Sequence, residues 1–168
     1  MNKKVEEVLN EQINREYHSA YLYLSMCAYF EAKNLGGFSN FMRVQYQEEV
    51  SHAMKFFDHI IERGGRVTLQ PVKGVKTEWI DVIEVFEDTL AHEKFITKSI
   101  NGLLDVAYEE KDYATINMLQ WYVAEQVEEE ANVSGILEQL RMVEGKGAGL
   151  FMLDREMNNR TFVDTTQK

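Results

Sequence analysis

One short motif in this chain joins two side-chain types that bind metal ions. Glu49-Val50-Ser51-His52 has the form Glu-x-x-His. Residues three apart share one helix face, so its carboxylate and imidazole can hold a single ion. Later in the chain, Gln126-Val127-Glu128-Glu129 is a weaker version, with a neutral first ligand and no histidine. The motif is common by itself, but the pair suggests one firm and one labile metal position.

Four long segments carry apolar residues at helical spacing, and polar side chains interrupt each stripe. The interruptions are Glu16 in the first segment, Glu49 and His52 in the second, Glu93 in the third, and Gln126 with Glu129 or Glu130 in the fourth. Each lies about twelve to fourteen residues into its helix, so packed helices of equal length bring them to one level.

Buried, unpaired carboxylates cost several kcal/mol each, and no Lys or Arg occupies a core position near this level. A bound multivalent cation is the simplest way to satisfy them. Oxygen-rich ligation with one imidazole fits iron or manganese better than a structural zinc ion. The pattern therefore predicts a dinuclear metal site in the middle of a helical bundle.

Loop lengths indicate how the helices are arranged. Short breaks at 34–37 and 109–112 join the first helix to the second and the third to the fourth, which makes each pair antiparallel. The connection over 64–78 holds the only proline and can reach roughly 50 Å, against roughly 45 Å for a 30-residue helix. Helices two and three are then parallel. We expect one all-α domain over 1–168: a four-helix bundle at about 3–144 with one long crossover, then a short fifth helix at about 148–158.

Composition excludes several classes of protein. A net charge of −10 and a pI near 4.9 argue against nucleic-acid binding, which needs clustered Lys and Arg. Cys27 is the only cysteine, which excludes an internal disulfide, a CxxC pair and a four-cysteine metal site. No basic region followed by an apolar run opens the sequence, and no apolar stretch is long enough to span a membrane. We expect a cytoplasmic protein without membrane or nucleic-acid partners.

Several stretches resemble the ferritins, most closely the non-haem ferritins of prokaryotes. They are Leu9-Asn10-Glu11-Gln12 leading to Glu16, Gln47-Glu48-Glu49 with His52, His92-Glu93, and Leu119-Gln120-Trp121-Tyr122 leading to Glu125-Gln126. The resemblance covers nearly the whole chain and implies the ferritin-like form of the bundle. It also implies iron storage in a hollow homo-oligomeric shell of 24 chains, with ferroxidase activity: dioxygen or peroxide oxidises Fe(II), and Fe(III) joins a mineral inside the shell.

The resemblance also assigns roles to residues. Glu16, Glu49 and His52 would hold the first iron, and Glu93 and Gln126 would complete the second, with Glu49 bridging. A possible third iron would use the carboxylates of Glu48, Glu125, Glu128 and Glu129. Tyr23 corresponds to a tyrosine beside the centre and is a candidate electron donor, although a purely structural core aromatic is an equal alternative.

Departures from related families narrow the interpretation. Gln126 and Glu129 stand where bacterioferritins have a glutamate and a ligand histidine, and Val50 replaces their haem-ligating methionine, so we expect no haem. Ile116 and Leu119 replace the two acidic residues of the animal three-fold channel, which leaves the iron route open. The terminal residues 165–168 do not form the basic tail of DNA-binding mini-ferritins.

Two alternatives remain. A di-iron redox enzyme of the peroxidase or oxidase type would retain its metals. Such an enzyme would be expected to have a second Glu-x-x-His motif and usually an electron-transfer module, and this sequence shows neither. A purely structural bundle would have lost ligands to apolar residues, and none is lost here.

Overall fold

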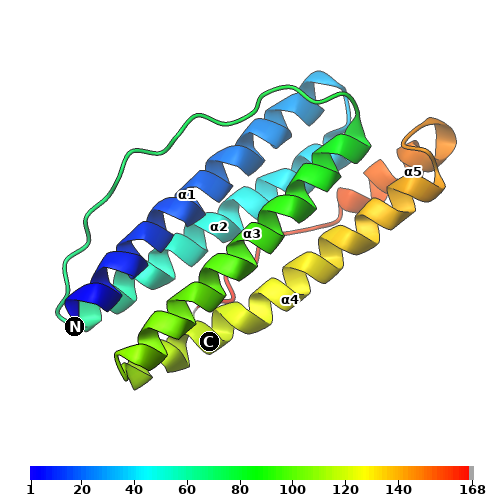
Figure 1. The fold of residues 1–168 in the computed structure, drawn as a ribbon. Helices are drawn as coiled ribbons and strands as arrows, with labels where there is room; N and C mark the ends of the chain where they lie inside the picture. The colour runs from blue at the N-terminus through cyan, green and yellow to red at the C-terminus, as the bar shows by residue number, and fades with distance from the viewer. Residues whose placement is uncertain (167–168) are drawn as a thin grey trace.

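The computed structural model describes residues 1–166, so Gln167 and Lys168, which belong to the predicted domain and tail, lie outside the described residues. Within that range the chain forms helices and no strands. The helices are α1 (Lys3–Ala32), α2 (Gly36–Glu62), α3 (Val82–Glu109), α4 (Tyr113–Met142) and α5 (Gly147–Met157). Figure 1 shows α1 to α4 side by side as a bundle, with α5 at one end. The expected all-α bundle with a short fifth helix is confirmed.

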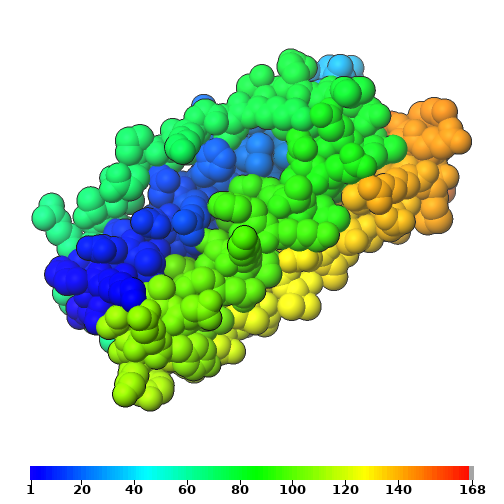
Figure 2. All heavy atoms as spheres, viewed as in Figure 1, coloured from blue at the N-terminus to red at the C-terminus, as the bar shows by residue number. Residues whose placement is uncertain are grey.

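A long crossover, residues 63–81, joins α2 to α3 and lies along α1 (Figures 1 and 2). Asn10 Nδ2 donates to the carbonyl of Arg66 at 3.0 Å, and Ser25 Oγ donates to the carbonyl of Lys76 at 2.7 Å. Side chains of α1 thus satisfy backbone groups of a segment that has no ladder of its own. Because residue numbers rise together along α1 and the crossover, α3 begins at the same end of the bundle as α2, and the two helices run parallel.

The third helix begins slightly later than the expected start near Trp79. Asp81 accepts a hydrogen bond from the backbone N–H of Glu84 at 2.9 Å, so it caps the helix and Val82 becomes its first residue. Trp79 remains buried before the helix, and its indole N–H donates to Asp88 at 2.8 Å.

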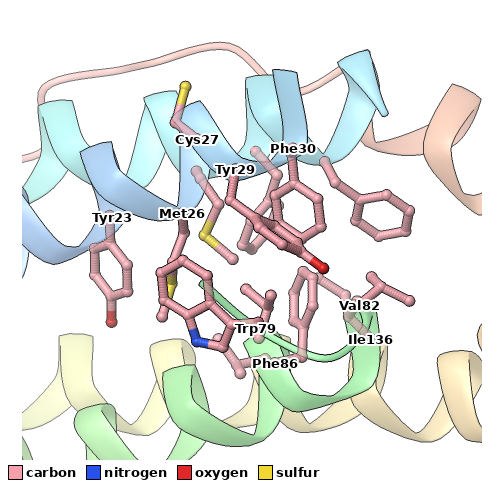
Figure 3. Close-up of a cluster of buried hydrophobic side chains, with 14 of the residues drawn as sticks. Tyr23, Met26, Cys27, Tyr29, Phe30, Trp79, Val82, Phe86 and Ile136 are labelled. Atoms are coloured by element: carbon pink, nitrogen blue, oxygen red, sulfur yellow. The ribbon is translucent and has the colours of Figure 1, made fainter. Parts of the chain in front are cut away.

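The core has two apolar parts. One surrounds Phe30, Phe38 and Phe86 at the end near α5 (Figure 3), and the other surrounds Leu9 and Phe56 at the opposite end. Between them lies a layer of buried polar side chains, namely Gln45, Glu16, Glu49, His52, Glu93, Gln126 and Glu129. The predicted interruptions of the four stripes therefore meet inside the bundle, at one level.

At two places the structure shows which of two adjacent residues faces the core, and the second is the choice between Glu129 and Glu130 that periodicity left open. Tyr23 is fully buried whereas Leu24 is 40% exposed, so the tyrosine faces the core. On α4, Glu129 is buried while Glu130 is only partly buried and accepts a hydrogen bond from Thr97 at 2.5 Å. Glu129, rather than Glu130, belongs to the polar layer.

Helix α5 docks against the beginning of α2. Leu35, the residue at the α2 N-cap, makes no side-chain cap, and Asp154 of α5 takes this role by accepting from the N–H groups of Gly37 and Phe38 at 2.9 and 3.0 Å. A Cβ at position 37 would lie 1.5 Å from the carbonyl oxygen of Asp154, so this approach requires glycine. None of the described helices combines the length and apolar character that a membrane crossing needs.

Candidate metal centre

Glu16 from α1 and Glu49 and His52 from α2 form the most compact group of possible ligands. Their ligand atoms all lie within 4.8 Å of one another, and the three side chains are buried. His52 Nδ1 is 3.6 Å from Glu49 Oε2. Helical spacing explains the pair on α2, because residues 49 and 52 lie one turn apart on the inner face.

Two carboxylate oxygens in this group, Glu16 Oε2 and Glu49 Oε2, are buried and have no hydrogen-bond partner. Buried polar atoms are nearly always paired, and an unpaired carboxylate oxygen is especially costly. A cation bound between these oxygens and the His52 imidazole would remove that cost. The donor set, two carboxylates and one imidazole, suits iron or manganese.

Glu93 from α3 and Gln126 from α4 face each other across the same layer. The Gln126 amide donates to Glu93 Oε2 at 3.0 Å, and the Tyr23 hydroxyl donates to Glu93 Oε1. Figure 3 shows the Tyr23 ring pointing from α1 across the bundle. Glu93 does not join the compact three-residue group, and both its oxygens are held by neutral donors. The structure thus brings all five predicted ligands of the two positions into one layer, with the Glu93 side closed by hydrogen bonds.

The layer strongly disfavours free negative charge. Burial and the nearby Glu49 carboxylate raise the pKa of Glu16 well above its ordinary value, and burial with the Glu93 charge raises the pKa of Glu49 in the same way. Burial and the Glu129 charge raise the pKa of Glu93 to about 8. Without a cation Glu93 keeps its proton at neutral pH and the burial of Glu16 and Glu49 favours their protonated forms, so a metal ion that binds here competes with protons.

Two glutamines that sequence reasoning did not assign to the site support it. Gln12 Nε2 donates to Glu16 Oε1 at 2.7 Å, and Gln45 Nε2 donates to Glu129 Oε2 at 3.0 Å. Both are fully buried, and the available signal was a polar residue on the inward face of its helix. Amide donors of this kind orient ligands and limit their rotamers.

The four carboxylates suggested for a third ion do not share one environment. Glu129 is buried, Glu48 and Glu125 are partly buried, and Glu128 is exposed. Glu125 Oε1 lies 4.0 Å from His52 Nε2, which connects this set to the central group. Burial is the largest cause that raises the pKa of Glu48, to about 7, and Arg160 opposes it.

Arg160, which follows α5, is the residue of this region that the sequence did not indicate. Its Nη2 donates to Glu48 Oε2 at 2.6 Å. No pattern in the sequence could place it there, because its position depends on the path of the chain after α5.

Together, the crossover bundle and the buried carboxylate–histidine layer define a four-helix protein with a candidate dinuclear metal centre. A family model described as "Ferritin-like domain" matches residues 6–143, and the chain belongs to this family. The resemblance stated from the sequence is confirmed.

Individual relatives agree with this assignment. The chain is 42% identical over 159 residues to a bacterial non-heme ferritin of Campylobacter jejuni, covering 95% of each chain, and 40% identical to one of Bacteroides fragilis, covering 95% of this chain and 99% of the relative. The crystal structure of an open pore ferritin from the hyperthermophilic archaeon Archaeoglobus fulgidus is similar with a TM-score of 0.95 and 52% identity, covering 96% of this chain and 99% of the other.

Proposed function

We propose that this chain is the subunit of an iron-storage ferritin with ferroxidase activity. It would bind Fe(II) as substrate in the buried layer, oxidise it with dioxygen or peroxide, and pass Fe(III) to a mineral inside a shell of 24 copies. The observation that carries the proposal is the pair of unpartnered buried oxygens, Glu16 Oε2 and Glu49 Oε2, beside His52. Unpaired carboxylates inside an apolar bundle destabilise the fold, and a bound cation would offset that cost.

In this proposal Glu16, Glu49 and His52 hold the first iron. Glu93 and Gln126 complete the second position, with Glu49 bridging. Iron supplies the electrons that the oxidant accepts. The carboxylates favour Fe(III) over Fe(II) because their negative charge stabilises the more highly charged ion. Gln126 adds no charge, so the second position binds product weakly enough to release it.

The names of the relatives support iron storage, and the fold and candidate ligands agree with it. Several large apolar side chains on the surface, Tyr113, Met142, Phe151 and Met152 among them, are more than half exposed and offer area for contacts between copies. The same proposal includes a shell assembled through these side chains and a single domain over 1–168. It also includes a metal centre without haem and a cytoplasmic location that supplies Fe(II).

The test adds excess Fe(II) in air to the metal-free protein and measures iron and protein together across gel filtration. Ferric iron far above two per chain, eluting with a particle much larger than one chain, is the expected result. Glu49→Gln should lose this capacity, whereas Glu7→Gln, which removes the same charge from an exposed position, should keep it. About two irons per chain, never exceeded, would instead support a di-iron redox enzyme that retains its metals. No bound iron would refute both.

A further inference from the structure

The segment after α5 brings a positive charge to the acidic cluster Glu48, Glu125, Glu128 and Glu129. Asn40 Nδ2 donates to the carbonyls of Met157 and Arg160, at 3.2 and 2.9 Å, which turns the chain back toward α2. Arg160 Nη2 then donates to Glu48 Oε2 at 2.6 Å, and its guanidinium lies 4.3 Å from the centroid of the Phe41 ring.

This guanidinium is incompletely satisfied. Its Nη1 atom is buried and has no hydrogen-bond partner, although a guanidinium carries five donors. Among residues 1–166, Arg160 is the only Lys or Arg that forms an ion pair with the cluster. It also acts electrostatically on Glu125, and its charge partly offsets the repulsion among these carboxylates. Arg160 therefore provides charge to the cluster without the full set of bonds of a permanent structural pair.

We propose that Arg160 is a built-in counter-ion of this cluster, which occupies the third metal position in the metal-free protein and leaves when a metal ion binds there. The inference rests on the proposed function, and it adds to the two positions of that function a third metal position at this cluster. A divalent cation and the guanidinium compete for the Glu48 carboxylate, because Arg160 already engages its Oε2 atom and two positive charges on one carboxylate repel each other.

Two consequences follow from this competition. The central pair of positions fills first, since its unpartnered oxygens meet no internal cation, while an ion at the third position must displace Arg160. Loading of the third position also loosens the terminal segment 160–166. Hydrogen bonds from Asn40 Nδ2 to the Arg160 carbonyl at 2.9 Å and from Lys55 Nζ to the Thr166 carbonyl at 2.7 Å still tie this segment to α2.

A purely structural ion pair between Arg160 and Glu48 is the competing explanation. The two explanations predict different affinities for a metal ion at the cluster. The side chains of Arg160 and Glu48 are 23% and 18% exposed, so solvent screens their attraction. As a structural pair, Arg160 would change stability and leave metal affinity alone. As a counter-ion, its removal should strengthen binding of the third ion by about tenfold, the effect of one nearby, partly screened unit charge.

The experiment measures anaerobic Mn(II) binding to the assembled, metal-free protein by equilibrium dialysis. Arg160→Gln should bind the third ion about tenfold more tightly than the wild type. Arg160→Lys, which keeps the charge, should remain close to the wild type. Arg155→Gln is the matched control, because it removes an arginine of α5 that lies over the ring of Phe151 and does not pair with the cluster. Gel filtration confirms that each variant keeps the particle size of the wild type.

The first two Mn(II) ions separate this inference from the proposed function. Two tightly bound ions and an unchanged or weaker third ion in Arg160→Gln would overturn the inference and leave the function standing. The same conclusion holds if two ions bind and no third ion binds to any variant. Failure of the first two ions to bind to the wild type would contradict both the inference and the proposed function.

Hydrogen exchange supplies a second measurement that needs no Arg160 variant. The amides of Arg160 and Thr166, which donate to the Met157 carbonyl and to Asp164 Oδ1, should exchange faster in the wild type once Mn(II) exceeds two per chain, but not before. Glu48→Gln, which removes the charged acceptor of Arg160, should show the faster exchange without Mn(II). Unchanged exchange in the wild type at three ions per chain would overturn the inference.

Discussion

The Gln126 amide on α4 donates to Glu93 Oε2 on α3 at 3.0 Å, so a neutral donor closes one side of the candidate centre. In Gln126→Glu this donor becomes a carboxyl group beside another carboxyl group. We expect the metal-free variant to lose about 1–3 kcal/mol of stability at pH 8, because two buried acids repel when ionised. The same variant should release the second Mn(II) ion more slowly, since a charged ligand replaces a neutral one.

Thermal unfolding and Mn(II) dissociation check these two effects. Gln120→Glu, an exposed position on the same helix, adds the same charge and should change neither. Faster release of the second ion from Gln126→Glu would contradict the weak-ligand role proposed for Gln126.

Replacing a central carboxylate should stabilise the metal-free protein while it abolishes metal binding. Burial and the Glu93 charge raise the pKa of Glu49 far above its ordinary value, and its Oε2 atom is unpartnered. Glu49→Gln removes a buried acid whose raised pKa destabilises the folded state at this pH, and it should raise the midpoint of thermal unfolding, by an amount equivalent to about 1–3 kcal/mol near pH 8. Differential scanning calorimetry of both proteins without metal tests this, and a lower midpoint for Glu49→Gln would show that the carboxylate is structural.

Stability of the metal-free protein should fall as pH rises from 6.5 to 8. Burial and Glu129 raise the pKa of Glu93 to about 8, and burial raises that of Glu48 to about 7, whereas the unfolded chain releases both protons near 4.5. The folded state therefore holds more protons in this window, and the free energy of unfolding decreases with pH, by up to about 1.4 kcal/mol per pH unit for each such group. Histidines with lowered pKa values, such as His92 at about 4, act in the opposite direction but only weakly here, because the unfolded imidazole loses most of its proton near pH 6.5, at the lower end of this window.

Urea unfolding at pH 6.5, 7.25 and 8 measures that slope. Glu93→Gln should flatten it, because the variant removes one of the titrating groups. Saturating Mn(II) should reverse its sign, since metal binding favours the deprotonated carboxylates. A metal-free protein more stable at pH 8 than at pH 6.5 would contradict the charge assignment.

Periodicity predicted the central ligands because the spacing of residues on a helix is a local property. Glu16, Glu49 and His52 were assigned to inward faces from their own segments alone, and long, unbroken helices bring them together. The choice between Tyr23 and Leu24 was not accessible, because adjacent positions both border a stripe and only packing against α3 decides.

Contacts made by connections and tails were beyond the reach of the sequence. Arg160 reaches Glu48 across 112 positions of the chain, and Asp154 caps α2 from α5, and neither partner is marked by a repeat or motif. Likewise, the sequence predicted a start of α3 near Trp79, but the helix begins at Val82. The Asp81 side chain caps it by accepting a hydrogen bond from the N–H of Glu84, and composition alone does not reveal that contact.

Tyr23→Phe separates the two interpretations of Tyr23. The ring stays in the core, but Glu93 Oε1 loses its hydroxyl donor. One lost buried hydrogen bond costs about 1 kcal/mol, so we expect Fe(II) oxidation in stopped-flow absorbance to slow about fivefold. Tyr122→Phe is the matched control: it loses a hydroxyl bond to the backbone carbonyl of His52 and should oxidise Fe(II) at nearly the wild-type rate. Equal rates in the wild type and Tyr23→Phe would make Tyr23 a core aromatic only.

A single added methyl group at position 37 should disrupt the docking of α5 against α2. In Gly37→Ala the new Cβ would lie 1.5 Å from the carbonyl oxygen of Asp154, so α5 must move away and α2 must lose the Asp154 cap. We expect a loss of about 2 kcal/mol or more, because overpacking and the loss of a cap add together. The displaced segment carries Arg160, so hydrogen exchange in residues 147–166 should also increase.

Gly36→Ala is the internal comparison for this prediction. A Cβ at position 36 meets nothing within 4 Å, and alanine favours the helix, so this neighbouring change should be neutral or stabilise by up to about 1 kcal/mol. The midpoint of thermal unfolding should thus fall for Gly37→Ala and stay unchanged or rise for Gly36→Ala. Equal midpoints for both variants would show that α5 is not held against α2 in the way the Asp154 contact requires.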